Sequence, residues 1–555
     1  MTRTGEVKFY HRMAIFPIIL FSLFFLLPLF ATLSKAFILD NKFSLENLKA
    51  VITSKYTLQI LSFTILQALI SALISILIAF PGAYYFSNYK ARGKRLILSL
   101  SSLCFTLPSI LVVLGFVIFY GNSGLINSIL KALFNLENPP LKILYTFKAI
   151  IMAHAFLNIP IALSLITDYY SSLPRSVEKV AATLGASPIK IFFSITFPRL
   201  IPILLSAFLL IFLFCFSSFA IILVLGGGPQ FTTIEVEIYR QAKISLNYNN
   251  AASFALLSLF FNLIILTLSS FVSTRINTNE ERKQEVLPKN KKKVSKVLFT
   301  IYFTLFILSI LGPLLAIVYR SFISTSAKVG IGFSLNQYQM LLGNIRATGG
   351  LGPAIDAIRN SLIIAVLTAF ISSTFALFIV LYIANKKKGR LDIILMLPMA
   401  VSSVIIGLGF LIIKSVIPYH STLLGYTLVI IAHVIITLPF AIKTILPSRL
   451  SLNTNFLNSA YTIGASPLRA CLTLEIPQLL PSLSKAFIFT FALSMGEVNA
   501  TLLLTEGKII TLPVLLYRLI GSYNFQGACA LGTLLIAITF IIFFITLLYD
   551  KRNKK

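Results

Sequence analysis

The chain has 555 residues, of which 57% are hydrophobic and 12% are charged, and its mean hydropathy is +0.91. A soluble core cannot hide that much apolar surface, and several stretches exceed the ~18 uninterrupted apolar residues that mark a membrane-spanning helix. The composition therefore argues against a set of buried soluble helices. It predicts an all-α integral membrane protein.

About twelve spans of roughly 20 residues each are expected. The first apolar run is longer than the roughly 7–15 residues of a secretory signal, so it is expected to remain as a span. In chain order the expected spans are Met13–Ala36, Leu58–Phe80, Leu96–Tyr120, Ala149–Tyr169, Leu200–Leu225, Ala251–Val272, Leu298–Tyr319, Ser361–Ala384, Leu391–Ile413, Leu423–Ile445, Ala486–Leu504 and Leu531–Leu548.

The net charge of +30 could indicate either a nucleic-acid partner or a membrane topology, and the positions of the basic residues distinguish the two. Basic clusters occupy the N-terminus, the even-numbered connections (among them Lys90–Arg95 and Asn385–Arg390) and the C-terminal tail. All of these lie on one side of the expected topology, which the positive-inside rule makes cytoplasmic. Both termini are therefore expected in the cytoplasm, and a nucleic-acid partner is not expected.

The chain repeats itself on either side of a charged interval, Arg275–Lys296. The phrase AHAFLNIP ends at Pro160 and AHVIITLP ends at Pro439, 279 positions later, while SILVVLGF and SVIIGLGF are 294 apart. The difference matches a longer third connection in the first half. The pattern predicts transmembrane domains at 1–274 and 297–555, joined by a cytoplasmic basic linker at 275–296, as two parallel repeats of six helices.

A short polar phrase containing Gly-Ala-Ser-Pro occurs once in each half, at Gly185–Pro188 and Gly464–Pro467. Gly185 can take a left-handed conformation that ends one helix, while Ser187 and Pro188 suit the N-cap and first position of the next. The phrase therefore predicts a helix–turn–helix elbow on the cytoplasmic side. A single elbow could be an ordinary turn, but two in register predict a docking surface for two like partners.

The stretches Lys179–Pro202 and Asn458–Pro481 resemble the E-A-A-x-x-x-G loop of permease subunits of ATP-binding-cassette (ABC) importers. The resemblance implies a type I importer fold in the bacterial cytoplasmic membrane, two copies of an ATPase subunit, and an extracytoplasmic substrate-binding protein. The acidic residue of the loop is replaced by Lys179 and Asn458, so its ion pair is not expected. The residues implied to couple to the ATPase are Lys179, Ala181, Ala182, Gly185, Ala186, Ser187, Pro188, Asn458, Ala460, Gly464, Ala465, Ser466 and Pro467.

Among such permeases the chain looks closest to the fused permeases of thiamine and ferric-iron importers. Phe216–Tyr239 and Thr511–Tyr523 resemble the thiamine branch somewhat more. The chain has no G-x-x-x-x-G-K-[ST] phosphate loop, so energy is expected from a separate subunit. No catalytic residue, cofactor or metal site is expected, and the cargo is a small molecule or ion, with thiamine or a related cation favoured.

Polar residues inside the expected spans mark a candidate substrate pathway, because burying them is costly unless they face a partner or water. They are Ser217, Ser218, Ser494, Glu497 and Asn499. Glu497 could line the path of a cationic cargo, or it could pair with a lysine or reach the outer interface. The matched residues His154 and His433 are expected to pack by hydrogen bonds. Glu235 and Glu237 could either meet a binding protein or be solvated.

Two other classes of protein remain as alternatives. A gradient-driven secondary transporter with six-plus-six repeats would explain the basic Gly-Lys-Arg and Lys-Gly-Arg connections. It would leave the duplicated elbow unexplained, and the network of paired charges that proton relay needs is not apparent. A membrane enzyme is disfavoured because no nucleophile–base cluster or H-E-x-x-H motif is found near the spans.

Overall fold

The computed structural model describes residues 3–39, 42–91, 93–94, 97–98, 101, 106–273, 293–324, 332–343, 354–385, 397–417, 421–453, 455–505 and 509–552. Most of the expected linker and most of the cluster Asn385–Arg390 lie outside these ranges, as do parts of Lys90–Arg95 and of the tail. Residues 293–296 of the expected linker form the start of a helix.

The first half consists of helices and one short hairpin. Its elements are α1 (Arg3–Phe37), β1 (Ile38–Leu39), β2 (Lys42–Phe43), α2 (Glu46–Thr53), α3 (Lys55–Asn88), α5 (Ser109–Tyr120), α6 (Leu125–Phe134), α7 (Phe147–Ser172), α8 (Ser176–Thr183), α9 (Pro188–Ile191), α10 (Phe197–Phe216), α11 (Ala220–Leu225), α12 (Ile234–Tyr239) and α13 (Tyr248–Ser273).

The second half repeats this order, except that no helix in its described part corresponds to α6. Its elements are α14 (Lys293–Ser321), β3 (Ile323–Ser324), β4 (Gly332–Phe333), α15 (Asn336–Gly343), α16 (Ala354–Asn385), α18 (Ser403–Val416), α19 (Thr422–Leu450), α20 (Asn455–Thr462), α21 (Pro467–Ala470), α22 (Ile476–Gly496), α23 (Asn499–Leu504), α24 (Leu512–Gly521) and α25 (Phe525–Arg552). The antiparallel pairs Ile38–Phe43 and Ile323–Phe333 show that even the small hairpin after the first helix is duplicated.

Eleven helices in the described ranges are long and apolar enough to cross a membrane, and α18 and α24 are shorter apolar helices. The protein is thus an all-α integral membrane protein, as its composition predicts. The expected ninth span, Leu391–Ile413, corresponds to the 14-residue α18, and residues 391–396 lie outside the described part.

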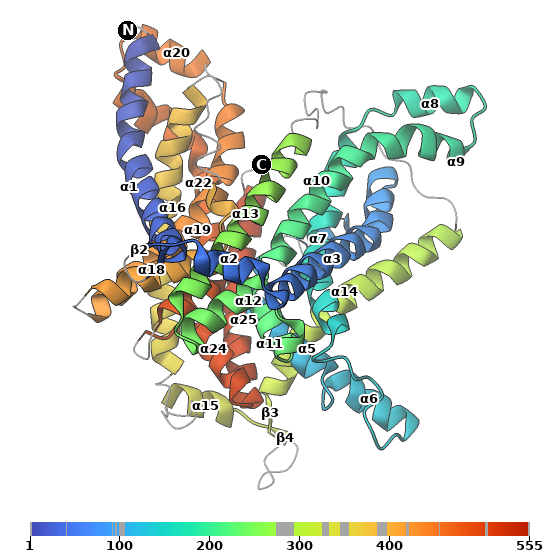
Figure 1. Cartoon of the computed structure of the whole chain (residues 1–555). Coiled ribbons are helices and arrows are strands. Elements are labelled where there is room, and N and C mark those ends of the chain that lie inside the picture. The colour runs from blue at the N-terminus through green and yellow to red at the C-terminus, as the bar shows by residue number, and fades with distance from the viewer. Residues whose placement is uncertain are drawn as a thin grey trace.

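The first helix of each half packs against the other half (Figure 1). Helix α1 lies on α13, α16 and α18, and α14 lies on α25 and α5. A Cβ on Gly409 would lie 2.1 Å from the carbonyl oxygen of Pro28, and a Cβ on Gly115 would lie 3.0 Å from the Cβ of Pro313. The repeated Leu-Gly-Phe therefore admits a proline of the crossing helix in each half, and the two halves are interlocked.

Both Gly-Ala-Ser-Pro elbows lie toward the upper end of Figure 1. Helix α20 lies beside the N-terminus at the top, and α8 and α9 lie at the upper right. Helices α6 and α15 and the hairpin β3–β4 lie at the lower end. The elbows of the two halves thus share one end of the helix bundle.

Candidate functional site

The first elbow ends α8 with the hydrogen-bond pattern of a Schellman motif. Gly185 has φ +82°, its N–H donates to Ala182 O (3.1 Å), and Ala186 N–H donates to Ala181 O (3.1 Å). Ser187 then caps α9, since its Oγ accepts from Lys190 N (3.4 Å), and Pro188 occupies the first turn. The left-handed glycine, the serine cap and the initial proline predicted from sequence are confirmed.

The second elbow repeats this geometry bond for bond. Gly464 has φ +92°, its N–H donates to Tyr461 O (3.1 Å), and Ala465 N–H donates to Ala460 O (3.0 Å). Ser466 Oγ accepts from Arg469 N (3.3 Å), and Pro467 begins α21. The alanines at 181 and 460 supply the carbonyl that closes each turn. Because Gly185 and Gly464 have positive φ, a β-branched residue at either glycine would break the motif.

Each elbow exposes apolar side chains at matched positions. Leu184 is 82% exposed, and Ile463, its equivalent in the second half, is 87% exposed. Three further exposed pairs are matched in the same register: Val177 with Phe456, Ile189 with Leu468, and Phe193 with Leu472. Lys179, Ala182, Asn458 and both capping serines are also exposed. An apolar surface of this kind, repeated at one end of the molecule, is typical of a docking site.

The elbows continue without a break into long helices. A π-helical segment, Phe192–Thr196, joins α9 to α10, and Cys471–Glu475 joins α21 to α22 in the same way. In the first half Thr196 Oγ1 donates to Glu178 Oε1 (2.6 Å), which fastens α8 to the π-helical segment. A force applied to an elbow would therefore reach α10 or α22 directly.

The fifth and eleventh expected spans are interrupted, which corrects the sequence prediction of continuous helices. Helix α10 ends at Phe216, and α11 starts after a short break at Ala220. Helix α22 ends at Gly496, and α23 starts at Asn499. Ser217, Ser218 and Glu497 thus lie at helix breaks. Discontinuous helices are a common way to line a transport site, because their ends expose polar groups.

A cavity of about 220 Å³ lies at these breaks and brings together three of the predicted pathway residues. Ser217 and Ser218 line it from the first half and Asn499 from the second, together with His154 and Asn158. Ser217 Oγ accepts a hydrogen bond from Asn262 Nδ2 (3.2 Å). Polar residues of the first half, and Asn499 of the second, therefore line part of a cavity whose other walls are apolar.

The other two predicted pathway residues are used elsewhere. Ser494 Oγ lies 2.7 Å from His433 Nδ1, and His433 Nε2 lies 2.8 Å from Thr501 Oγ1. Glu497 Oε1 accepts from Ala500 N (3.0 Å) at the start of α23, so its partner is a backbone amide rather than the lysine considered from sequence. The expected hydrogen-bonded packing of His433 is confirmed.

Sequence reasoning named Glu235 but did not predict that it is buried between the halves. Glu235 on α12 is 0% exposed; its Oε1 accepts from Ser258 Oγ and its Oε2 from Ser402 Oγ, each at 2.7 Å. Ser402 caps α18 of the second half, so Glu235 connects the halves. The solvated state considered for this glutamate is wrong. The sequence signal for its burial was its place in α12, where apolar residues lie next to it and one turn away.

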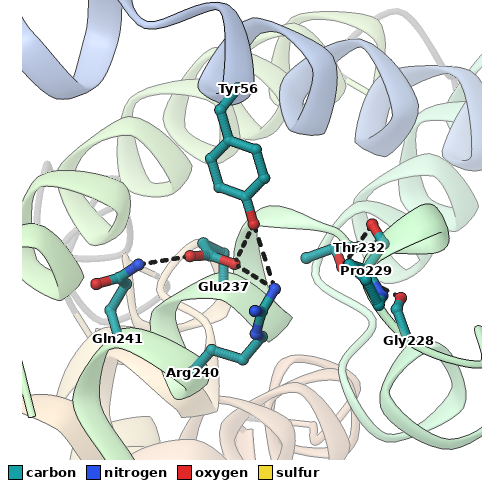
Figure 2. Close-up of polar contacts among 7 residues, drawn as sticks. All are labelled: Tyr56, Gly228, Pro229, Thr232, Glu237, Arg240 and Gln241. Atoms are coloured by element: carbon teal, nitrogen blue, oxygen red, sulfur yellow. Dashed lines mark hydrogen bonds and ion pairs between the residues drawn. The ribbon is translucent and has the colours of Figure 1, made fainter. Parts of the chain in front are cut away.

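Glu237 is also buried, at the point where α12 meets the start of α3 (Figure 2). Its carboxylate accepts from Tyr56 Oη (2.9 Å) and Gln241 Nε2 (2.6 Å), and it pairs with Arg240 Nη1 (3.3 Å). Beside this cluster the exposed turn at Gly228 and Pro229 accepts from Thr232 Oγ1. Glu237 therefore fastens α12 to α3 and is not a solvated surface residue.

Comparison with known proteins finds a family model that matches part of the chain and relatives that align with most of it. Residues 71–283 match the family described as binding-protein-dependent transport system inner membrane component. Two relatives named thiamine transport system permease protein ThiP align over most of both chains: that of Haemophilus influenzae is 27% identical over 503 residues (89% of each chain), and that of Escherichia coli K12 is 26% identical over 519 residues (91% of each).

A relative of another name aligns over a similar length. The ferric transport system permease protein FbpB of Actinobacillus pleuropneumoniae is 25% identical over 556 residues, covering 98% of this chain and 79% of that protein. These alignments are long enough to include both repeats and both elbows. Over nearly its whole length, the chain resembles the fused permease subunits of binding-protein-dependent ABC importers.

Proposed function

We propose that this chain is the membrane-spanning permease of an ABC importer, and that its two elbows are the docking sites for two copies of an ATPase subunit. The observation that carries the proposal is the pair of matched elbows at one end of the bundle. They share their hydrogen bonds and their exposed apolar side chains, as two copies of one partner require. A gradient-driven secondary transporter does not dock an ATPase, so the secondary-transporter alternative leaves the pair of elbows unexplained.

The connection of each elbow to a long helix supports a mechanism. Closure of two ATPases on ATP would displace both elbows, and the unbroken passage through the π-helical segments into α10 and α22 transmits that displacement. Because the interlocked halves meet at the helix breaks, their rocking would open the cavity to one side and then to the other. This is rigid-body switching between two states.

We propose thiamine, or a cation related to it, as the cargo, delivered by an extracytoplasmic binding protein. The names of the relatives from H. influenzae and E. coli support this substrate. Ferric ion is the second candidate, favoured by the relative that aligns with 98% of this chain. We place the protein in a bacterial cytoplasmic membrane with its termini and elbows in the cytoplasm.

The proposal is tested by charge substitution on the elbows. Leu184→Asp and Ile463→Asp should each weaken, and together abolish, co-purification with the cognate ATPase, since a charged group opposes burial in an apolar groove. Leu133→Asp is the matched control: this leucine is 70% exposed on α6, at the opposite end of the bundle. Retention of the ATPase by the double elbow variant would contradict the proposal.

The cargo is tested in proteoliposomes containing the permease, its ATPase and its binding protein. ATP-dependent uptake of radiolabelled thiamine, without uptake of ferric ion, would support the first candidate. The reverse result would support the second. Accumulation driven by an ion gradient without any ATPase would overturn both.

A further inference from the structure

A second cavity, of about 850 Å³, lies between the C-terminal end of α3 and the N-terminal half of α14. Two ring pairs form part of its wall: the ring centroids of Tyr85 and Phe299 are 3.9 Å apart, and those of Phe86 and Phe303 are 4.5 Å apart. This cavity is remote from the helix breaks. It lies where the first helix of the second half crosses the first half.

The matched contact in the other half is filled by side chains. Helix α1 is the equivalent of α14, and it packs closely against α16, the equivalent of α3 (Figure 1). Tyr10 and Ala14 of α1 are 0% exposed and belong to one apolar cluster with Tyr382 of α16. His11, at the position equivalent to Lys296, stacks on Tyr382 with 5.2 Å between the ring centroids. The open space beside α14 is therefore not a necessary consequence of the repeated fold.

Two lysines line this cavity, one from each half. Lys90 follows the end of α3, Lys296 lies in the first turn of α14, and both side chains are exposed. Neither lysine has a hydrogen-bond or ion-pair partner among the described residues. The described lining contains no acidic side chain. The positive-inside rule accounts for lysines at this end of the bundle, but not for a large cavity between them. Their charge favours an anionic occupant.

The cavity extends from the membrane surface into the bilayer. Asn88 Nδ2 donates to Tyr170 Oη (3.0 Å), which holds the end of α3 beside the end of α7, where the chain enters the first elbow. From Lys296 to Ile307, the last lining residue of α14, the helix rises by about 16 Å at ~1.5 Å per residue. This length is roughly half of the ~30 Å hydrocarbon core. The cavity thus has the depth of one leaflet, with its lysines at the head-group level.

We propose that this cavity binds one anionic phospholipid of the cytoplasmic leaflet. The lipid phosphate lies between the ammonium groups of Lys90 and Lys296, and an acyl chain lies along Phe303 and Ile307. Basic pockets between membrane helices on the cytoplasmic side are suited to such head groups. A free anion would need the lysines alone, whereas a lipid also uses the apolar wall.

The bound lipid supplies the packing that α1 obtains directly from α16. It holds α14, the first helix of the second half, against α3 of the first half. The inference rests on the proposed function only for the side of the membrane, because the elbows define the cytoplasmic end. Lipid binding itself requires neither the ATPase nor the cargo.

The test uses the full chain, delipidated in a non-ionic detergent, with phosphatidylglycerol and phosphatidylcholine of identical acyl chains as probes. Native mass spectrometry should show at least fivefold more bound phosphatidylglycerol, and only this lipid should raise the melting temperature. Lys90→Gln/Lys296→Gln should lower phosphatidylglycerol binding at least fivefold. Lys142→Gln/Lys148→Gln is the matched control, because it removes two exposed lysines near the start of α7, at the opposite end, and it should bind as the unaltered chain does.

A second pair of variants tests the apolar part of the site. Thr304→Phe fills the cavity from an exposed position and keeps both lysines, so it should also lower phosphatidylglycerol binding. Thr267→Phe, at an exposed position of α13 outside the lining, should not. Equal binding of the two lipids, full binding by the double lysine variant, or an equal melting-temperature rise with inorganic phosphate would overturn the inference. Failure of ATP-dependent uptake would contradict the proposed function and leave these measurements unchanged.

Discussion

Arg449 and Glu475 form a buried ion pair that the equivalent positions of the first half do not have. Nη2 of Arg449 lies 2.5 Å from Oε1 of Glu475, and the two side chains are 3% and 0% exposed. Tyr10 Oη on α1 donates to the other carboxylate oxygen (2.6 Å). The three side chains thus connect α19 and α1 to the π-helical segment that follows the second elbow.

Removing one member of this pair should destabilise the protein strongly. Glu475→Gln would leave the Arg449 charge buried without a counter-ion, which typically costs about 3–5 kcal/mol. The melting temperature of the purified protein should fall by several degrees.

The first half provides the matched control for this variant. Tyr170 and Thr196 occupy the positions equivalent to Arg449 and Glu475. The double variant Arg449→Tyr/Glu475→Thr should recover most of the lost stability, because neither new residue is charged. A double variant as unstable as Glu475→Gln would contradict this account.

Valine at the elbow glycines should uncouple ATP hydrolysis from uptake. Gly185 and Gly464 have φ +82° and +92°, where a β-branched residue is strained by roughly 1–2 kcal/mol. The Schellman turn would open, and the exposed elbow would lose its shape while the membrane spans stay folded. The measurement is uptake per ATP hydrolysed in proteoliposomes.

Two further variants control for the strain. Asn tolerates the left-handed region, so Gly185→Asn should retain more uptake than Gly185→Val. Gly521→Ala, at an open position with ordinary backbone angles, should have no effect. Unchanged uptake in both valine variants would argue against the role of the elbows.

Loss of Glu235 should loosen the contact between the halves. Glu235→Ala leaves the hydroxyls of Ser258 and Ser402 buried without their acceptor, at a cost of about 1–3 kcal/mol each, which a lower melting temperature would report. Glu137→Ala, at an exposed acid after α6, should be neutral.

A double-mutant cycle can isolate the bond across the halves. Glu235→Ala and Ser402→Ala should be less than additive in melting temperature, since both remove the same hydrogen bond. Strict additivity would show that the two residues do not interact in the native protein.

Glu497→Gln should leave assembly intact but impair transport. The glutamine Oε1 can still accept from Ala500 N, so α23 keeps this hydrogen bond, while the carboxyl group at the break between α22 and α23 is lost. Uptake is compared with the amount of folded protein by size-exclusion chromatography. Glu497→Ala, which removes the cap as well, should lower both. Loss of folded protein in Glu497→Gln would assign this residue a purely structural role.

Local sequence was enough to predict the elbows. Every hydrogen bond of the turn at Gly185 joins residues close together in the chain, so the glycine, serine and proline specify it almost by themselves. The recurrence of the same phrase in the second half then predicted the parallel duplication. Membrane insertion likewise followed from composition, because apolar length is a property of the chain and not of its packing.

The partners of buried polar groups could not be predicted in this way. His154 and His433 occupy matched positions, yet Nε2 of His154 has no hydrogen-bond partner among the described residues, whereas both ring nitrogens of His433 lie within hydrogen-bond distance of a hydroxyl. Glu235 reaches Ser402 across 167 positions, and Tyr10 reaches Glu475 across 465. These contacts depend on helix rotation and on the exchange of first helices between halves. Sequence thus determined which segments span, turn and repeat; the tertiary structure decided which polar atoms are left open, because only packing between distant helices brings hydrogen-bonding atoms within reach.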